Sequence, residues 1–395
     1  MILVDLLMLI ITTKVGFWLI HRMHQYFPVL PIKYFKNLFL YHTFFSLVYC
    51  GMTFFTIADA FSYYHSSEFS LVPGTSFINT IAFLLSDVFF LPYLSTFFVF
   101  HMVSFFWMPI FYLSIKENII NSKALDQCLK CILFLPGLSY WTALIGKDGL
   151  MLLGLTSFMF SLNRIAKRKK WFVFSLLLVI FIRPHIAAVA LFALFLSILI
   201  HFRYFTSRFV CFGLVIAAIA FPLGITYVLG FIGFSVTGAV DILNLFRLFE
   251  FITHRYGFEL ANLDLGNSVV NISQYSFPFQ VFTYLYRPLV IDAKNALQLF
   301  ASLENIVYLG LTICTFHRYM FAFLFSRKSL YYTTNLFFIF IYLTFMAPSI
   351  ANLGLASRQK LMVVPSLVAV GFICRNYERV VRVRRGDYNC VITSD

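Results

Sequence analysis

Five short clusters of polar and charged residues stand between long apolar stretches of this sequence, and they contain the residues best suited to chemistry. In chain order they are Asp59–Tyr64, Gly146–Gly149, Arg183–His185, Tyr286–Pro288 and Asn352–Lys360. A carboxylate at the edge of an apolar stretch can take a proton from a hydroxyl group. Arg binds phosphate through paired hydrogen bonds, and Lys binds it as a point charge. The clusters therefore indicate proton transfer beside an anionic, phosphate-containing ligand.

The first cluster offers a general base. Asp59 directly follows an apolar stretch, and aromatic residues including Tyr63 come after it. We expect Asp59 to take the proton from an attacking hydroxyl group, with Asp148 and His185 as alternative bases. Tyr63 is expected to contact the substrate. A solvated loop carboxylate or a helix cap is the alternative interpretation of Asp59, and a lone histidine such as His185 usually satisfies a local hydrogen bond.

The second cluster is a tight turn in which Lys147 and Asp148 lie between two glycines that permit the turn. An ion pair that caps a helical hairpin is the structural interpretation of these two residues. Two observations favour a functional role instead. So tight a turn does not need two adjacent charges, and Trp141 lies a few residues before it. Trp side chains serve as platforms for sugars and also as anchors at the membrane interface. We expect Lys147 to bind substrate.

The remaining clusters contribute positive charge. Arg183 interrupts an apolar run, and burial of an Arg in a membrane costs about 2–3 kcal/mol unless it has a partner or a ligand. In the alternative, purely structural interpretation, the long side chain of Arg183 extends to the membrane–water interface and binds no ligand. Arg287, Arg358 and Lys360 stand at the edges of later apolar stretches. We expect these four residues to bind a phosphate or diphosphate group.

Composition places the clusters in a membrane protein. Of the 395 residues, 61% are hydrophobic and 12% are charged, whereas soluble domains have about 25% charged residues. Several apolar blocks approach the ~20 residues that cross a bilayer as a helix. They lack the alternation of period two that membrane barrel strands need. We predict an all-α, polytopic helical bundle that forms one integral membrane domain over residues 1–395.

About eleven helices are expected to span the bilayer, because backbone groups in hydrocarbon must be satisfied within their own segment. Residues 77–92 are predicted as a re-entrant or interfacial helix, or as an early start of the third span. The predicted spans are residues 2–20, 37–57, 93–115, 127–145, 149–163, 171–183, 185–202, 209–232, 303–324, 331–347 and 361–375.

Most of the 30 Lys and Arg residues lie in every second loop between the predicted spans and in the C-terminal tail. These loops are predicted to face the cytoplasm. This set includes the basic run within residues 164–170 and the C-terminal tail, so the C-terminus is expected inside. The same loops account for the net charge of +14. Without a basic–aromatic groove or a zinc pattern, we expect no nucleic-acid partner.

Nine basic residues fall outside this set, and all but the first are predicted on the outward face. Because topology disfavours positive charge there, an anionic ligand is the expected reason for it. A lipid-linked sugar presents a phosphate or diphosphate at this depth. The nine residues are Lys14, Lys147, Arg183, Arg247, Arg255, Arg287, Lys294, Arg358 and Lys360.

Two further features modify the regular pattern of spans. Residues 233–302 form a long outward loop, and polar residues at helical spacing between Asp241 and His254 predict an amphipathic helix on the membrane surface. Arg183-Pro184-His185 divides residues 171–202 into two arms, of which the first is too short to cross unaided. Seven cysteines are present, without a set that completes a zinc site.

Together these clusters resemble the O-antigen and capsule polymerases (Wzy-type) and the wider GT-C-like membrane glycosyltransferases. The resemblance covers most of the chain in its layout. It is carried by the acidic-aromatic first outward loop, the Lys-Asp turn, the two Arg-Pro pairs and the late outward Arg358. Arg255 precedes Gly266 by the Arg-x10-Gly spacing of some polymerase outer loops, a spacing that also occurs by chance. The long soluble C-terminal domain of many GT-C enzymes is absent from this sequence, which argues against a protein-modifying transferase.

The resemblance implies an enzyme of lipopolysaccharide or other surface-polysaccharide biosynthesis in the bacterial inner membrane. A chain on undecaprenyl diphosphate would be the donor, and a hydroxyl group of a second lipid-linked repeat unit would be the acceptor. Asp59 would be the base, while Arg183, Arg287, Arg358 and Lys360 would stabilise the leaving diphosphate. No metal or other cofactor is expected if the arginines neutralise its charge. Membrane lipid, a chain-length regulator and a flippase are the further partners that it implies.

Other functions remain open at this point. A GT-C transferase that adds a single sugar from a polyprenyl-phosphate donor would share every feature above. A lipid-linked oligosaccharide flippase would be expected to show two similar halves, and an acyltransferase would need a His-containing motif at the cytoplasmic ends. A purely structural membrane protein would not explain the outward arginines. Walker loops, GxGxxG, HExxH and Gx-Ser-xG motifs are all missing from the sequence.

Overall fold

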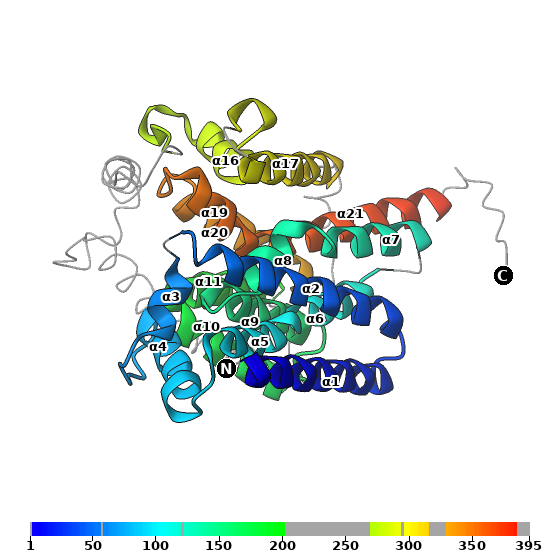
Figure 1. Ribbon diagram of the computed structural model, residues 1–395. Coiled ribbons are helices and arrows are strands. Elements are labelled where there is room, and N and C mark those ends of the chain that lie inside the picture. Colours follow the sequence, from blue (N-terminus) through cyan, green and yellow to red (C-terminus); the bar gives the residue numbers. More distant parts are fainter. Residues whose placement is uncertain are drawn as a thin grey trace.

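The computed structural model describes residues 2–56, 58–119, 122–201, 269–293, 296–315 and 329–384. Within these ranges the protein is built from helices, and the only β contact is an isolated bridge between Val269 and Asn352. The predicted all-α fold is confirmed for these residues, as Figure 1 shows.

Helices make up most of the residues that the structure describes. In chain order they are α1 (Ile2–Tyr26), α2 (Ile32–Met52), α3 (Asp59–Tyr64), α4 (Thr75–Phe83), η1 (Leu84–Val88), α5 (Tyr93–Phe105), α6 (Trp107–Lys116), α7 (Lys123–Leu133), α8 (Pro136–Thr142), α9 (Lys147–Leu162), α10 (Lys169–Ile182), α11 (Pro184–Ile200), η4 (Ile272–Gln274), α16 (Phe277–Tyr286), η5 (Val290–Asp292), α17 (Ala296–Thr315), α19 (Leu330–Met346), α20 (Leu353–Gln359), η6 (Lys360–Met362) and α21 (Val364–Arg384).

The apolar helices indicate a membrane protein. Among the described residues, Ile2–Tyr26 and Tyr93–Lys116 are each long and apolar enough to cross a bilayer. Two bent pairs bring the number to four if each pair is one span: Pro136–Thr142 with Lys147–Leu162, bent by 111°, and Leu353–Met362 with Val364–Glu378, bent by 54°. Other apolar helices, such as α11 and α19, are shorter. The bundle of about eleven spans therefore stays a prediction.

Helix α9 forms the centre of the described core. Every residue from Asp148 to Leu162 is buried, as expected of a helix that is apolar all round and surrounded by other helices. A small residue allows one of these neighbours to come close. A Cβ atom added to Gly154 would lie 2.7 Å from Val179 Cγ2 of α10, so glycine sets the separation of the two helices.

Two prolines interrupt helices that would otherwise be continuous. Pro109 lacks the N–H group that would bond to the carbonyl of Phe105, and the break between α5 and α6 falls at this point. Pro136 begins α8, with two residues between it and Leu133, the last residue of α7. The predicted span 127–145 is therefore two short helices rather than one.

The segment predicted at 77–92 forms the separate short helix pair α4 and η1. The chain leaves helical geometry before α5 begins at Tyr93, so the segment is not an early start of the third span. Phe77 of α4 packs on Phe181 of α10, with ring centroids 5.0 Å apart. This contact holds α4 against the end of α10.

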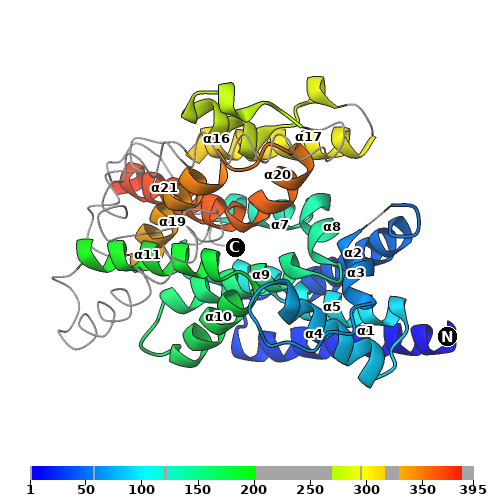
Figure 2. The same ribbon diagram turned by 90° about the vertical axis from the view of Figure 1, so that its left-hand side faces the viewer.

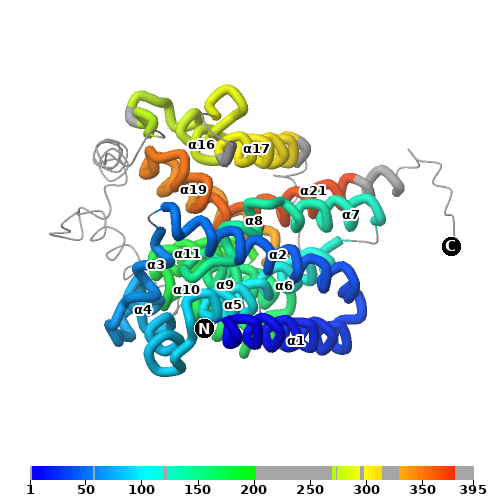
Figure 3. The backbone as a smooth tube through the Cα atoms, in the orientation of Figure 1, coloured from blue at the N-terminus to red at the C-terminus, as the bar shows by residue number. Residues whose placement is uncertain are grey.

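The helices run between two ends of the molecule. In Figure 1, α3 and α4 lie at the left-hand end, whereas α1 and α2 are joined at the right-hand end. Figure 2 looks onto the end with α3 and α4 and places α16 and α17 above α19 and α20. Figure 3 traces the same path from α1 at the bottom to α17 at the top.

Several predicted elements lie outside the described residues. They are the span 209–232, the amphipathic helix at 241–254, Arg255, and the part of the span 303–324 that follows residue 315.

Candidate functional site

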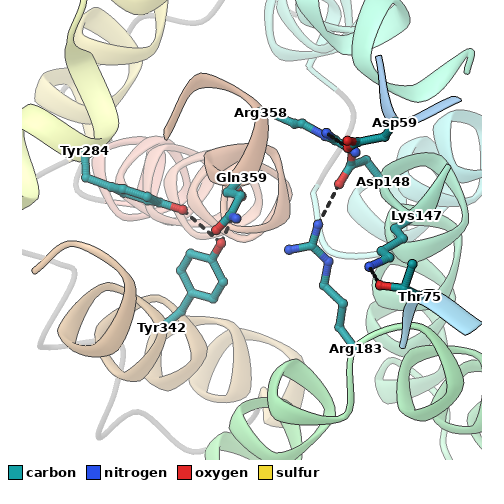
Figure 4. Close-up of polar contacts among 9 residues, drawn as sticks. All are labelled: Asp59, Thr75, Lys147, Asp148, Arg183, Tyr284, Tyr342, Arg358 and Gln359. Atoms are coloured by element: carbon teal, nitrogen blue, oxygen red, sulfur yellow. Dashed lines mark hydrogen bonds and ion pairs between the residues drawn. The ribbon is translucent and has the colours of Figure 1, made fainter. Parts of the chain in front are cut away.

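The centre of the candidate site is the carboxylate of Asp148, which two arginines from distant segments share. Arg183 Nη2 donates a 3.0 Å hydrogen bond to Asp148 Oδ1, and Arg358 Nε donates to Asp148 Oδ2. The Asp148 side chain is only 2% exposed. Figure 4 shows the carboxylate between the two guanidinium groups. The predicted Lys-Asp turn, the first Arg-Pro pair and the late Arg therefore meet at one point.

Arg358 extends the site to the first predicted cluster. Its Nη1 atom donates a 2.7 Å hydrogen bond to Oδ2 of Asp59, the first residue of α3. The side chain of Asp59 is 54% exposed, in contrast with that of Asp148. One buried and one accessible carboxylate are thus joined through a single guanidinium group.

Lys147 provides a third positive charge beside the two arginines. Its Nζ atom donates a 2.6 Å hydrogen bond to Oγ1 of Thr75, at the start of α4. Gly74 places Thr75 there with a φ of +114°, a conformation that favours glycine. The Gly74 N–H in turn donates to the carbonyl of Phe181, at 2.8 Å. Asp59, Lys147, Asp148, Arg183 and Arg358 are hereafter the charged cluster.

Tyr63 and His185 lie beside the charged cluster. Tyr63 is buried one turn after Asp59 in α3. Burial, reinforced by the Asp59 carboxylate, raises the pKa of Tyr63 to about 12, so its hydroxyl group stays protonated and can donate a hydrogen bond. His185 is half-buried at the start of α11, where Arg183 and Lys147 act on it electrostatically.

An aromatic group borders the charged cluster on the side of Arg358. The guanidinium carbon of Arg358 lies 6.0 Å from the centroid of the Trp141 ring, within the range of a cation–π contact. Tyr140 packs edge-on against Trp141 at 5.1 Å, and Tyr49 packs against both. Trp141 is only half-buried. An apolar ring face therefore stands next to the charges.

A buried polar network around Thr142, the last residue of α8, holds the turn that carries Lys147 and Asp148. Thr142 Oγ1 is 3.0 Å from Nε2 of His42 and accepts a 3.3 Å hydrogen bond from Nε1 of Trp107. Its carbonyl accepts a 2.7 Å hydrogen bond from Oγ of Ser104. Helices α2, α5 and α6 thus all hold the end of α8, which sets the direction in which the chain enters α9.

The position of Arg183 follows from the proline after it. Helix α10 has 14 residues and ends at Ile182, while Pro184 occupies the first turn of α11, where its missing N–H costs nothing. At 1.5 Å per residue, α10 is about 21 Å long, shorter than the ~30 Å of a hydrocarbon core. The predicted short first arm is confirmed, and Arg183 lies at its end.

Arg287 lies outside the charged cluster and has a carboxylate of its own. Its Nε and Nη2 atoms donate hydrogen bonds of 3.0 and 2.7 Å to the two oxygens of Asp292. The hydrogen bonds from Arg287 hold the pKa of Asp292 below its usual value, and the same contact raises the pKa of Arg287. This is a local, two-pronged ion pair between neighbours in sequence.

Lys360 also points away from the charged cluster. It is 3% exposed, and its Nζ atom donates to Asn305 Oδ1 and, at 3.3 Å, to the carbonyl oxygen of Leu285. Glu304, next to Asn305 in α17, accepts a hydrogen bond from the backbone N–H of Gly137 at the start of α8. The grouping of Lys360 with Arg358, expected from their closeness in sequence, is not seen.

Several residues around the site carry little signal in the sequence. Thr75, Tyr284, Tyr342 and Asn305 are uncharged polar residues in apolar surroundings, where such residues are common. Glu304 is different, because a carboxylate within an apolar helix is costly and usually functional. That cost is the signal in the sequence by which Glu304 could have been selected.

The chemistry available to the charged cluster is that of anion binding and proton transfer. Among the described residues, Arg183 Nε is buried without a hydrogen-bond partner. Arg183 Nη1 and Arg358 Nη2 make none of the cluster's hydrogen bonds. A guanidinium group has five N–H donors, so both arginines keep donors for a ligand. Within the same residues, no three His, Cys, Asp or Glu side chains are placed to hold a metal ion.

A comparison of the chain with protein-family models, with curated proteins and with solved structures finds no match.

Proposed function

We propose that this protein is a membrane glycosyltransferase that polymerises lipid-linked oligosaccharide repeat units on the outer face of the bacterial inner membrane. The donor is a sugar chain on a polyprenyl diphosphate, and the product is an O-antigen or a similar surface polysaccharide. The observation that carries the proposal is the Asp148 carboxylate, which holds Arg183 and Arg358 side by side next to the accessible Asp59.

The paired guanidinium groups suit a diphosphate leaving group. Both arginines keep unused N–H donors, and Lys147 adds a further charge close by. Fixed donors of this kind stabilise charge that develops in a transition state, at little reorganisation cost. The Asp148 carboxylate offsets the repulsion between the two cations while the ligand is absent. Asp148 is therefore a positioning residue in this proposal.

Asp59 is the better placed of the two carboxylates to act as base. A base must reach the hydroxyl proton of a bound acceptor, and the side chain of Asp59 is 54% exposed while that of Asp148 is 2% exposed. Asp148 accepts hydrogen bonds from two arginines and Asp59 from one. The half-buried Trp141 ring beside Arg358 offers an apolar face to a sugar ring.

The reaction step is a substitution at the anomeric carbon of the donor. The acceptor hydroxyl oxygen forms the new bond to this carbon, and its proton passes to the Asp59 carboxylate. The bond between the anomeric carbon and the diphosphate oxygen breaks, and polyprenyl diphosphate leaves with the electron pair. Arg183 and Arg358 take up the negative charge that develops on this leaving group.

The test is a polymer assay with membranes from a source strain that lacks the gene. Restoring the wild-type chain is expected to restore long polymer on a gel together with release of polyprenyl diphosphate. Asp59→Asn removes the base and is expected to lower both by about 100-fold or more, within the usual contribution of general base catalysis. Glu68→Gln changes an exposed carboxylate in the same outward segment and is the matched control, expected to retain full activity.

The length of the product distinguishes this proposal from its alternatives. Addition of one sugar, with no ladder of repeat units, would instead indicate a transferase that uses a polyprenyl-phosphate donor. Long polymer made in membranes without the protein, or wild-type polymer made by Asp59→Asn, would contradict the proposal.

A further inference from the structure

Lys360 is a buried lysine whose hydrogen-bond partners are neutral oxygens, while the Glu304 carboxylate acts on it only electrostatically, without a hydrogen bond. Only 3% of the residue is exposed. Its ammonium group donates to the side-chain oxygen of Asn305 in α17 and to the Leu285 carbonyl in α16. Its ring contact is with Tyr308, 5.8 Å away. No ion pair involves Lys360 in the part of the chain that the structure describes.

Such a placement does not suit a ligand-binding lysine. Burial of an ammonium group costs several kcal/mol, and this cost is offset only where its donors are satisfied. Here the donors are turned toward α16 and α17, whereas Arg358, two residues earlier, is turned toward Asp148. A diphosphate at the charged cluster would have to displace these buried contacts to reach Lys360.

Asn305 is itself held in place, so it can serve as a fixed point for Lys360. Its Nδ2 atom donates a 2.8 Å hydrogen bond to the carbonyl of Pro288, which leaves its Oδ1 atom turned toward the ammonium group. Asn305 is 1% exposed. Lys360 is therefore bonded to a side chain whose orientation is already set by the α16–α17 connection.

A second anchor acts on the residue between Arg358 and Lys360. Tyr342 donates a 2.9 Å hydrogen bond to the carbonyl oxygen of Gln359, and the hydroxyl groups of Tyr342 and Tyr284 are 2.9 Å apart. Because the single proton of Tyr342 goes to Gln359, Tyr284 must be the donor to Tyr342. Figure 4 shows this chain on the opposite side of α20 from the charged cluster.

We propose that Lys360 is a positioning residue: its bonds to Asn305 and Leu285, together with the bond from Tyr342 to Gln359, fix the end of α20 and thereby the place of Arg358. This inference rests on the function proposed above. Arg358 reaches Asp148 and Asp59 from near the end of a helix of only seven residues. The anchors on the two following residues constrain that end of the helix.

The test is a double-mutant cycle between Lys360→Met and Arg358→Lys. Lys360→Met keeps an unbranched side chain of similar length but removes the N–H donors of the ammonium group. Arg358→Lys keeps the positive charge but removes the planar guanidinium group. The rate of polyprenyl diphosphate release is measured against donor concentration for wild type, both single variants and the double variant. The melting temperature of each purified variant in detergent is measured alongside.

Lys360→Met is expected to lower kcat about 10-fold and to change KM for the donor by less than about 2-fold, because a displaced Arg358 loses contact mainly in the transition state. In the Arg358→Lys background the same change is expected to lower kcat by no more than about 2-fold, since the two residues act as a unit. If Lys360→Met does not fold, Lys360→Gln takes its place in the cycle. Tyr342→Phe removes the other anchor and should lower kcat without a matching rise in KM.

Three results separate the inference from the proposed function. Effects of Lys360→Met and Arg358→Lys that multiply in full would make Lys360 a ligand contact and overturn the inference. Wild-type kinetics of Lys360→Met beside a slow Arg358→Lys would overturn the inference alone. Absence of polyprenyl diphosphate release by the wild-type chain would overturn the proposed function.

Discussion

Asp59 and Asp148 are the same chemical group in two environments, and the difference sets their roles. Asp148 is enclosed and binds both arginines, whereas Asp59 is accessible and binds one. Removing the enclosed Asp148 carboxylate would leave Arg183 without its carboxylate partner and Arg358 with Asp59 alone. Loss of one partner from a largely buried ion pair destabilises the fold strongly. An exposed ion pair contributes little to stability.

Alanine substitutions should therefore separate stability from activity at these two positions. Asp148→Ala is expected to lower the free energy of unfolding by about 3–5 kcal/mol, and Asp59→Ala by about 1 kcal/mol or less. Both variants should lose polymer synthesis. The measurement is thermal unfolding in detergent beside the polymer assay. Equal losses of stability in the two variants would contradict the burial that distinguishes them.

At the scale of residues, the sequence predicts charges better than it predicts their partners. Asp59, Lys147, Asp148, Arg183 and Arg358 stand out in the sequence because a charge is costly in apolar surroundings. The structure brings these five together. The same reasoning also selects Arg287 and Lys360, since the cost of a buried charge does not reveal which partner offsets it. Arg287 meets Asp292, five residues later, and Lys360 meets a neutral asparagine.

At the scale of elements, the bend between α8 and α9 places Lys147 and Asp148. The bend is 111°, and Gly149 lies at its inner side. A Cβ atom added to Gly149 would lie 2.5 Å from Cβ of Ser104 and closer still to the carbonyl oxygen of Thr142. The Thr142 backbone cannot yield easily, because the buried network fixes it. Glycine is thus required here for close approach rather than for an unusual φ.

Gly149→Ala is expected to open this bend and to shift Lys147 and Asp148 away from their partners. Overpacking of this kind costs about 1–3 kcal/mol, and polymer synthesis should fall with it. Gly51→Ala in α2 is the matched control, because a Cβ atom there would meet no atom within 4 Å. The control should be neutral or slightly stabilising. A Gly149→Ala variant with wild-type stability and activity would contradict the account of the bend.

The elements themselves could be predicted in part from the sequence. Long apolar blocks predicted α1, the α5–α6 span and α9, and the Arg183-Pro184 pair predicted the end of α10. Block length did not predict the division of residues 127–145, because hydropathy counts residues while Pro136 decides where the helix breaks. The sequence also did not predict the short helix α3, which carries Asp59. A helix of six residues gives no periodic signal.

At the scale of the whole molecule, the two ends of the helices have different charged groups. Asp59 and Thr75 belong to the end with α3 and α4, where the charged cluster lies. Near the opposite end, Arg168 donates hydrogen bonds of 2.5 and 2.7 Å to Glu117, and its sequence neighbours Lys167 and Lys169 are exposed. The distribution of Lys and Arg predicts that this second end faces the cytoplasm.

The most direct test of a shared outward site is the side from which single cysteines react. In a chain whose seven natural cysteines are replaced, one cysteine is placed at an exposed position: Ser62→Cys in α3, Gly354→Cys in α20, or Lys167→Cys near the opposite end. A maleimide that cannot cross the inner membrane is expected to label positions 62 and 354 in cells whose inner membrane is intact. Position 167 should react only after that membrane is opened. Labelling of positions 62 and 354 from opposite sides would place Asp59 and Arg358 apart and contradict the site.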